Sequence, residues 1–183
     1  MSQSVVASTV GVPAESDLQR IISQGITLWY QNRDRYRPLS DVLPTAKHCL
    51  LRPFFSTRLL DQIRYVQLGS ERLRLPLDEI RKFADVPAIE HQHGVTFIDT
   101  LVLNEQATER QWFHSLVHAT QMDVLGLESY IDLYVHALAR TRAYVKVPFE
   151  VQAFCLDTRF AASPSRCFSV AEEVRLWAAE RRY

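Results

Sequence analysis

The first clear pattern in the chain is a series of apolar residues at helical spacing between Ser16 and about Tyr36. Such a series predicts an amphipathic helix, because positions three and four apart share one helical face. Either Ser16 or Asp17 is expected to cap the first turn, and Pro38 is expected to end the helix. The apolar face consists of Leu18, Ile21, Ile22 and Trp29.

The next part of the chain shows shorter and weaker patterns. The segment LSDVLPTAKHCLLRPFF, residues 39–55, contains two prolines and is predicted to be a connecting stretch. Ser56 is placed to cap a short helix over TRLLDQ, and the alternation in IRYVQL (63–68) indicates a strand. Residues 69–93 mix charge with proline and predict only a short helix near 77–83.

A strand followed by helices is predicted for the second half of the chain. GVTFIDTLVLN (94–104) is rich in β-branched and aromatic residues, which favours a strand. Thr108 and Gln111 form a capping-box pattern at the start of a helix that Gly126 is expected to end. The spacing then predicts a helix over 127–143.

Two further helices complete the prediction. Pro148 suits the first turn of a helix that runs from about Phe149 to Ala162, and Ser169 suits the cap of a last one. Together the patterns predict an α+β fold with a small sheet in the middle and helices around it. We expect residues 1–14 to form a loose tail and residues 15–183 to form a single domain.

Composition narrows the class of protein. With 183 residues, 47% hydrophobic and 23% charged, the chain is typical of one soluble globular domain. Lys and Arg together number 21, as do Asp and Glu, so no overall field favours nucleic acid or an anionic membrane. No apolar run approaches the roughly 20 residues that cross a bilayer. We therefore expect neither nucleic acid nor membrane as a partner.

The N-terminal segment and the cysteines predict a cytoplasmic protein. MSQSVVASTVGVPAESD lacks the basic start and the continuous apolar core of a signal peptide. Cys49, Cys155 and Cys167 are odd in number and have no CxxC spacing, which favours a reducing compartment. They are interpreted as packing or surface residues, because free cysteine commonly behaves as a small hydrophobe.

The segment QWFHSLVHATQ (111–121) carries the first candidate for chemistry. His114 and His118 are four residues apart, so on a helix both imidazoles lie on one face and can converge on a tetrahedral zinc ion. An HxxxH pair also occurs by chance in ordinary chains, where both histidines bond to backbone or water. The pair alone therefore leaves both interpretations open.

Glu150 is a candidate third ligand. It falls in the first turn of the helix that Pro148 begins, on the same face as Asp157 and otherwise apolar residues. A carboxylate in apolar surroundings needs a cation or a hydrogen-bonding partner, and zinc would complete a His-His-Glu set with one open position. A first-turn glutamate is also favoured by the helix dipole alone. Asp157 is a candidate to orient a histidine, or else a solvated charge paired with Arg159 or Arg140.

A family resemblance extends over about residues 94–177. The stretches GVTFIDTLVLNE, ERQWFHSLVHATQMDVLGLESYIDLYV and VPFEVQAFCLDTRFAASPSRCFSVAEEVRLW resemble small, largely uncharacterised bacterial proteins with a gluzincin-type zinc-peptidase pattern. In that group a strand precedes HELVHxxQ on a helix, and a glutamate helix resembling PLExxAYxLxxRF follows. The resemblance implies a zincin-like fold: a small mixed sheet with an active-site helix and a glutamate helix packed on it.

The resemblance also implies roles for individual residues. His114, His118 and Glu150 match the zinc ligands, which makes zinc the expected cofactor. Gln121 matches the glutamine that follows the histidine motif. Tyr144 matches a tyrosine that precedes the third ligand and is a candidate hydrogen-bond donor to a transition-state oxyanion. A core aromatic with one polar tip is the alternative for Tyr144.

Ser115 departs from the pattern, because it stands where an HExxH enzyme has its general-base glutamate. Serine cannot take a proton from the attacking water near neutral pH, and loss of a general base costs a rate factor on the order of a hundred to ten thousand. His91, His93 and His136 are candidate replacements that the sequence does not place near the site.

Three functions follow from these residues. The leading hypothesis is a catalytically impaired pseudo-peptidase that binds zinc, with a peptide or protein ligand along the 94–104 strand. The first alternative is an active metallohydrolase that uses an unusual base. The second is a metal-free interaction domain with a relic site.

Overall fold

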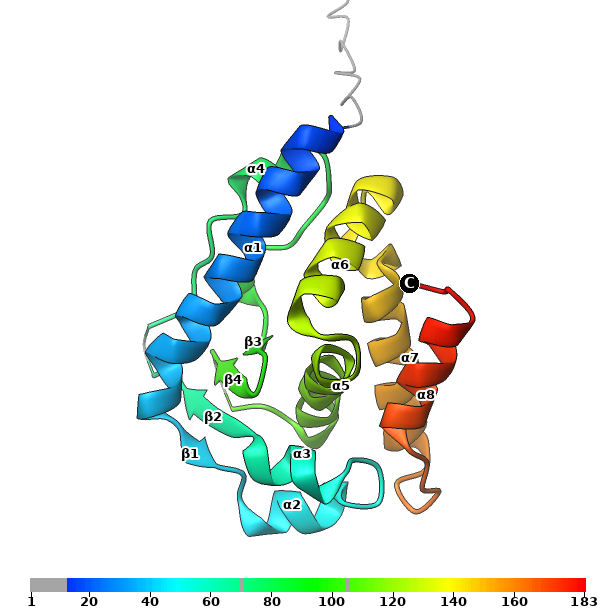
Figure 1. Cartoon of the computed structure of the whole chain (residues 1–183). Helices are drawn as coiled ribbons and strands as arrows, with labels where there is room; N and C mark the ends of the chain where they lie inside the picture. Colours follow the sequence, from blue (N-terminus) through cyan, green and yellow to red (C-terminus); the bar gives the residue numbers. More distant parts are fainter. Residues whose placement is uncertain (1–12, 70, 105) are drawn as a thin grey trace, which may run out of the picture.

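Helices surround a small sheet in the structure, which is a computed structural model and describes residues 13–69, 71–104 and 106–183 (Figure 1). The predicted α+β class is therefore confirmed. Most of the expected N-terminal tail, residues 1–12, lies outside the described residues. No helix of the described ranges is long and apolar enough to cross a membrane. All three cysteines are exposed and free.

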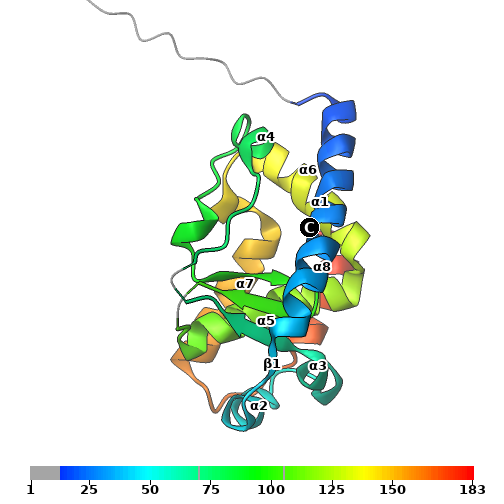
Figure 2. The ribbon, with the colours of Figure 1, turned by 90° about the vertical axis from the view of Figure 1, so that its left-hand side faces the viewer.

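The elements follow one another along the chain with short connections. The helices are α1 (Glu15–Tyr36), α2 (Thr45–Leu51), α3 (Thr57–Gln62), α4 (Asp78–Arg81), α5 (Glu109–Leu125), α6 (Leu127–Thr141), α7 (Pro148–Ala162) and α8 (Val170–Ala179). The strands are β1 (Asp41–Val42), β2 (Arg64–Gln67), β3 (Gly94–Phe97) and β4 (Thr100–Leu103). Both views place α2 and α3 at the end of the molecule opposite α4 (Figures 1 and 2).

The sheet is mixed and has the strand order β1-β2-β4-β3. β2 pairs with β4 in parallel, and the other two pairings are antiparallel. β4 is buried along its whole length, as expected for a strand with a neighbour on each edge. β3 is an edge strand, and outside the sheet it contacts α5 and, less extensively, α1.

The predicted helix boundaries are largely confirmed by their caps. The Ser56 and Ser169 side chains each accept a backbone N–H of the following helix, and Thr108 and Gln111 form the predicted capping box. Pro148 occupies the first turn of α7. Gly126 ends α5 with φ of 80°, a conformation that favours glycine.

The prediction for the start of α1 was wrong. Ala14 occupies the N-cap and provides no side-chain hydrogen bond, so Ser16 and Asp17 lie inside the helix. Asp17 still suits the first turn, where a negative charge is favoured by the helix dipole. The helix ends at Tyr36, and Pro38 follows in a short 3₁₀ segment, as expected from its effect on the preceding residue.

Residues 39–55 are more regular than predicted, because they contain β1 and α2. The two prolines border this helix instead of interrupting it: Pro44 is its N-cap residue and Pro53 follows its end. Leu51 is completely buried, so tertiary packing stabilises a helix too short to be stable by itself.

The predicted single strand over 94–104 is a hairpin of β3 and β4. The chain reverses at Ile98 and Asp99, and Ile98 has a positive φ of 60°. Arg33 and Arg37 at the end of α1 form ion pairs with Asp99 at 3.1 and 2.7 Å. No Gly or Asn in the sequence marks this turn. Ion pairs from a distant helix stabilise the turn instead.

α5 lies at the centre of the packing. It contacts α7 most extensively and also α8, α6 and β3. Phe113 on α5 stacks on Phe160 of α7 with ring centroids 4.5 Å apart, and Phe54 packs edge-on against both. The expectation that the glutamate helix packs on the sheet needs correction, since the main contact of α7 is with α5.

Candidate metal site

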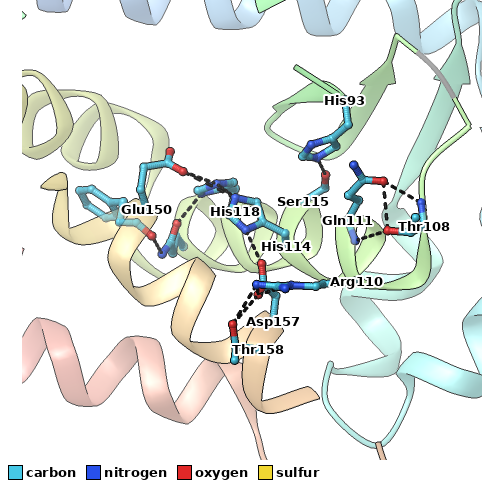
Figure 3. A network of polar contacts seen from close by, with 12 residues as sticks. His93, Thr108, Arg110, Gln111, His114, Ser115, His118, Glu150, Asp157 and Thr158 are labelled. Atoms are coloured by element: carbon cyan, nitrogen blue, oxygen red, sulfur yellow. Dashed lines mark hydrogen bonds and ion pairs between the residues drawn. The ribbon is translucent and has the colours of Figure 1, made fainter. Parts of the chain in front are cut away.

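The three predicted ligands come together between α5 and α7 (Figure 3). His114 and His118 point from one face of α5, and Glu150 faces them from the first turn of α7. The two histidine Nε2 atoms are 3.1 Å apart, and Glu150 Oε2 lies 3.5 Å from each of them. The described residues contain no other group of His, Cys, Asp and Glu with this geometry.

Hydrogen bonds determine which nitrogen each imidazole directs at the cluster. Nδ1 of His114 lies 2.9 Å from a carboxylate oxygen of Asp157, which can only accept, so Nδ1 carries the proton. Nδ1 of His118 lies 2.9 Å from Oε1 of Gln121. In their neutral forms both rings therefore present an unprotonated Nε2 to the cluster, as a metal ligand requires.

Glu150 is buried and only half satisfied. Its Oε1 accepts a hydrogen bond of 2.8 Å from the hydroxyl of Tyr134 on α6. Its Oε2 accepts none from the described residues. A buried carboxylate oxygen without a donor is costly. When both histidines are neutral, the lone pairs of their two Nε2 atoms and this oxygen converge on a point without a positive charge.

The spacing of these atoms fits a tetrahedral cation. Ligand atoms at roughly 2.0–2.2 Å from a tetrahedral zinc ion are about 3.4 Å apart. The three separations in the cluster, 3.1, 3.5 and 3.5 Å, are close to that value. The residues present therefore fit a divalent metal held by two nitrogens and one oxygen, with a fourth position open.

Protons partly replace such a cation in the metal-free protein. Burial disfavours charge on His114, but the hydrogen bond to Asp157 and the nearby Glu150 carboxylate outweigh it and raise the pKa of His114 to about 9. Burial also favours the neutral form of Glu150, yet the His118 and His114 rings hold the pKa of Glu150 well below its ordinary value. A metal ion must displace the proton on His114.

Asp157 has the orienting role that the sequence suggested. It is buried, and besides His114 it contacts Arg110, whose Nε donates to Oδ1 at 2.8 Å. The arginine partner is thus Arg110 of α5, while Arg159 pairs with Glu173 instead. Arg110 also donates to the hydroxyl of Thr158 and so connects the start of α5 with α7.

Gln121 orients His118 through a buried chain of amides. The Gln121 Nε2 donates to the backbone carbonyl of Phe149, which leaves Oε1 to accept from His118. The same Nε2 also donates to Oε1 of Gln152, an oxygen that accepts from the Tyr183 hydroxyl as well. Both histidines are therefore oriented by buried partners, as is usual for metal ligands.

Ser115 is buried and lies next to His93 (Figure 3). His93 precedes β3, and its Nε2 is 3.3 Å from Oγ of Ser115. Burial and the nearby His114 and His118 lower the pKa of His93 to about 4, so its ring is neutral at pH 7. Of the three candidate replacement histidines, only His93 reaches the site. His91 is exposed, and His136 lies beside Asp132 and Glu15.

The ligand cluster opens into a cavity of about 770 Å³. Its wall includes the three ligands together with Ser115, His93 and Tyr144. Burial and the negative charge of Glu150 raise the pKa of the Tyr144 hydroxyl, which therefore stays protonated and can donate a hydrogen bond. The position of Tyr144 is compatible with the oxyanion role that the resemblance implied, and that role stays a prediction.

The chain matches no protein-family model, no curated protein and no solved structure. The gluzincin resemblance is therefore a hypothesis that rests on the quoted residues. Sequence reasoning missed Tyr134, Arg110 and Gln152, which all contact the site through side chains from distant positions.

Proposed function

We propose that this protein is a zincin-like member of the metallopeptidase class that binds zinc through His114, His118 and Glu150 and has little or no hydrolytic activity. The observation that carries the proposal is the unpartnered Oε2 of buried Glu150, on which two histidine Nε2 atoms converge at 3.5 Å. In metal-free protein only the proton on His114 compensates this oxygen, from 3.5 Å and without a hydrogen bond, which makes a metal-free interaction domain the weaker alternative.

We assign zinc to this donor set. Two imidazoles and one carboxylate with an open position are typical of catalytic zinc sites. Such an ion, when bound, polarises a carbonyl and makes a water molecule more acidic. The chain itself orients both imidazoles through Asp157 and Gln121, holds Glu150 through Tyr134, and encloses the site in a cavity.

Ser115 limits the chemistry. Its hydroxyl occupies the position of the glutamate that takes up and returns a proton in HExxH enzymes, and it cannot do so near neutral pH. A rate lower by a factor on the order of a hundred to ten thousand is therefore expected relative to a chain with that glutamate. Ligand binding at the metal does not require the base and is expected to persist.

The test restores the glutamate. We expect the double variant Ser115→Glu, His93→Ala to hydrolyse an unspecific peptide mixture when zinc-loaded, because removal of the imidazole makes room for the longer side chain. His93→Ala alone is the matched control, and adding His118→Ala should abolish the gain. Efficient hydrolysis by the unaltered protein would contradict the proposed impairment.

A second function, an active metallohydrolase with an unusual base, is favoured by the His93–Ser115 contact of 3.3 Å. In this case the imidazole of His93 would accept the proton that Ser115 cannot. His93→Gln would then lower hydrolysis by a factor on the order of a hundred or more while leaving zinc content unchanged. Equal activity of His93→Gln and the parent would eliminate His93 as the base.

Peptide binding along the predicted strand is restricted by the hairpin. β3 is the edge strand beside α5, so it is the segment available for strand addition. The Nε1 of Trp29 on α1 already donates to the carbonyl of Thr96, and β3 has only four residues. Gly94, Val95 and Thr96 of β3 line the cavity, so a ligand in the cavity would lie beside this edge.

A further inference from the structure

The cavity beside the ligand cluster is mainly apolar. α1 provides Leu28 and Trp29, and α6 provides Ile131, Val135 and Leu138. Further apolar residues come from the segment between β2 and β3, among them Leu75, Leu77, Ile80, Val86 and Ile89. Its volume of about 770 Å³ lies within the range of roughly 300–1,000 Å³ that is usual for small-molecule sites.

Charge is distributed unevenly over this wall. No Lys or Arg of the described residues lines the cavity, whereas the carboxylates of Asp78, Glu79 and Glu150 do. Neutral His114 and His118 with ionised Glu150 give the cluster one negative charge, so a divalent metal would leave a net charge of about plus one. A bound metal would thus be the only strongly cationic group available to a ligand inside the cavity.

Hydrogen-bond donors in the cavity wall also suit an oxygen-bearing group. The amide Nε2 of Gln92, a residue that lines the cavity, is buried and has no partner among the described residues. The hydroxyl of Tyr144 is protonated and lines the same space. The Tyr144 hydroxyl already interacts with Glu150, whereas the Gln92 amide would be satisfied by an acceptor such as a carboxylate oxygen and not by a second cation.

We propose that the site binds a small carboxylic acid with an apolar chain, whose carboxylate meets the metal and whose chain fills the cavity between α1 and α6. This assignment rests on the metal site proposed above and names the ligand class for it. An extended peptide would need a free strand edge, and Trp29 already occupies the carbonyl of Thr96 on that edge. The mainly apolar wall instead suits a compact chain without buried amide groups.

The test measures binding of straight-chain carboxylates to zinc-loaded protein by calorimetry, with metal content determined on the same sample. Affinity should rise by about fourfold for each added methylene from butanoate to octanoate, until the cavity is full. Octanol, which has no carboxylate, should bind at least about tenfold more weakly than octanoate. Removal of zinc by a chelator should reduce octanoate binding to the level of octanol.

Two substitutions test the place of the chain. Val135→Phe fills the cavity from α6 and Leu28→Phe fills it from α1, so at least one folded variant should be obtained. Either should abolish the gain with chain length while leaving acetate binding and zinc content unchanged. Leu176→Phe, at a half-exposed position of α8 outside the cavity wall, is the matched control and should change nothing.

The outcomes separate this inference from the metal assignment. Zinc-loaded protein that binds octanoate no better than acetate would overturn the inference and leave the metal site intact. Octanoate binding that survives chelation would also overturn it, because the carboxylate would then not lie at the metal. Protein that takes up no zinc would overturn the metal site and, with it, the ligand assignment. A hydrophobic tripeptide that binds more tightly than every carboxylate would favour a peptide ligand instead.

Discussion

The substitution Asp157→Asn should weaken zinc binding although Asp157 is not a ligand. In the folded protein Oδ2 of Asp157 accepts from His114 Nδ1 at 2.9 Å, and Oδ1 accepts from Arg110 Nε at 2.8 Å and from the Thr158 hydroxyl at 3.2 Å. Asparagine has one acceptor oxygen, so it can face either His114 or the Arg110 side and presents an N–H group to the other. Arg110 is about half exposed and can turn to solvent, whereas the His114 ring is 6% exposed and cannot.

The expected magnitude follows from the loss of charge at Asp157. If asparagine keeps its oxygen on His114, a neutral acceptor replaces a carboxylate, and hydrogen bonds with an ionised partner are roughly twice as strong as neutral ones. The ring then becomes a less basic ligand. Loss of such an orienting partner costs a factor of about 10–100 in metal affinity, or roughly 1.4–2.7 kcal/mol.

A competition titration against a chromophoric chelator at fixed pH measures this effect. Asp132→Asn is the matched control, because Asp132 is likewise a carboxylate beside a histidine, His136, that does not belong to the cluster. We expect that control to bind zinc as the parent does. Equal zinc affinity of Asp157→Asn and the parent, in folded protein, would refute the role assigned to Asp157.

Three further predictions concern the same cluster. Gln121→Leu leaves the His118 Nδ1–H without its buried acceptor and should lower the free energy of unfolding by about 1–3 kcal/mol, measured by urea denaturation; an unchanged midpoint would contradict it. Tyr134→Phe removes the donor to Glu150 Oε1 and should destabilise the metal-free protein by a similar amount, and a stability equal to the parent's would exclude that bond. The raised pKa of His114 stabilises metal-free protein fully below pH 6.5, and this contribution disappears as the pH rises through 9. The melting temperature should therefore fall over that range in metal-free parent and much less in His114→Gln, and parallel curves would disprove the shift.

Elements with strong local signals were predictable from the sequence. Ser56, Thr108 and Ser169 cap their helices as expected, because a cap depends on residues within one turn of it. The hairpin at Ile98 was not predictable. Its turn is stabilised by ion pairs between Asp99 and the end of α1, which are more than sixty positions away in the sequence.

The candidate metal site likewise combines features that were predictable from the sequence with features that were not. The spacing of His114 and His118 and the place of Glu150 in a first turn were local features, and the structure brings the three together. The partners of these groups were less visible. Arg110 and Tyr134 reach the cluster only through the packing of α5, α6 and α7, and His93 reaches Ser115 because β3 lies beside α5. The spacing of apolar and polar residues along the sequence gives no information about side-chain contacts between separate elements.

The measurement that tests the metal assignment most directly is the zinc content of untagged protein purified without chelators, determined by elemental mass spectrometry. His118→Ala and His136→Ala are analysed alongside, the second as a histidine control outside the cluster. About one zinc per chain in the parent and in His136→Ala, and none in His118→Ala, is the expected result. A parent without metal after incubation with zinc, or a His118→Ala variant that keeps it, would contradict the assignment.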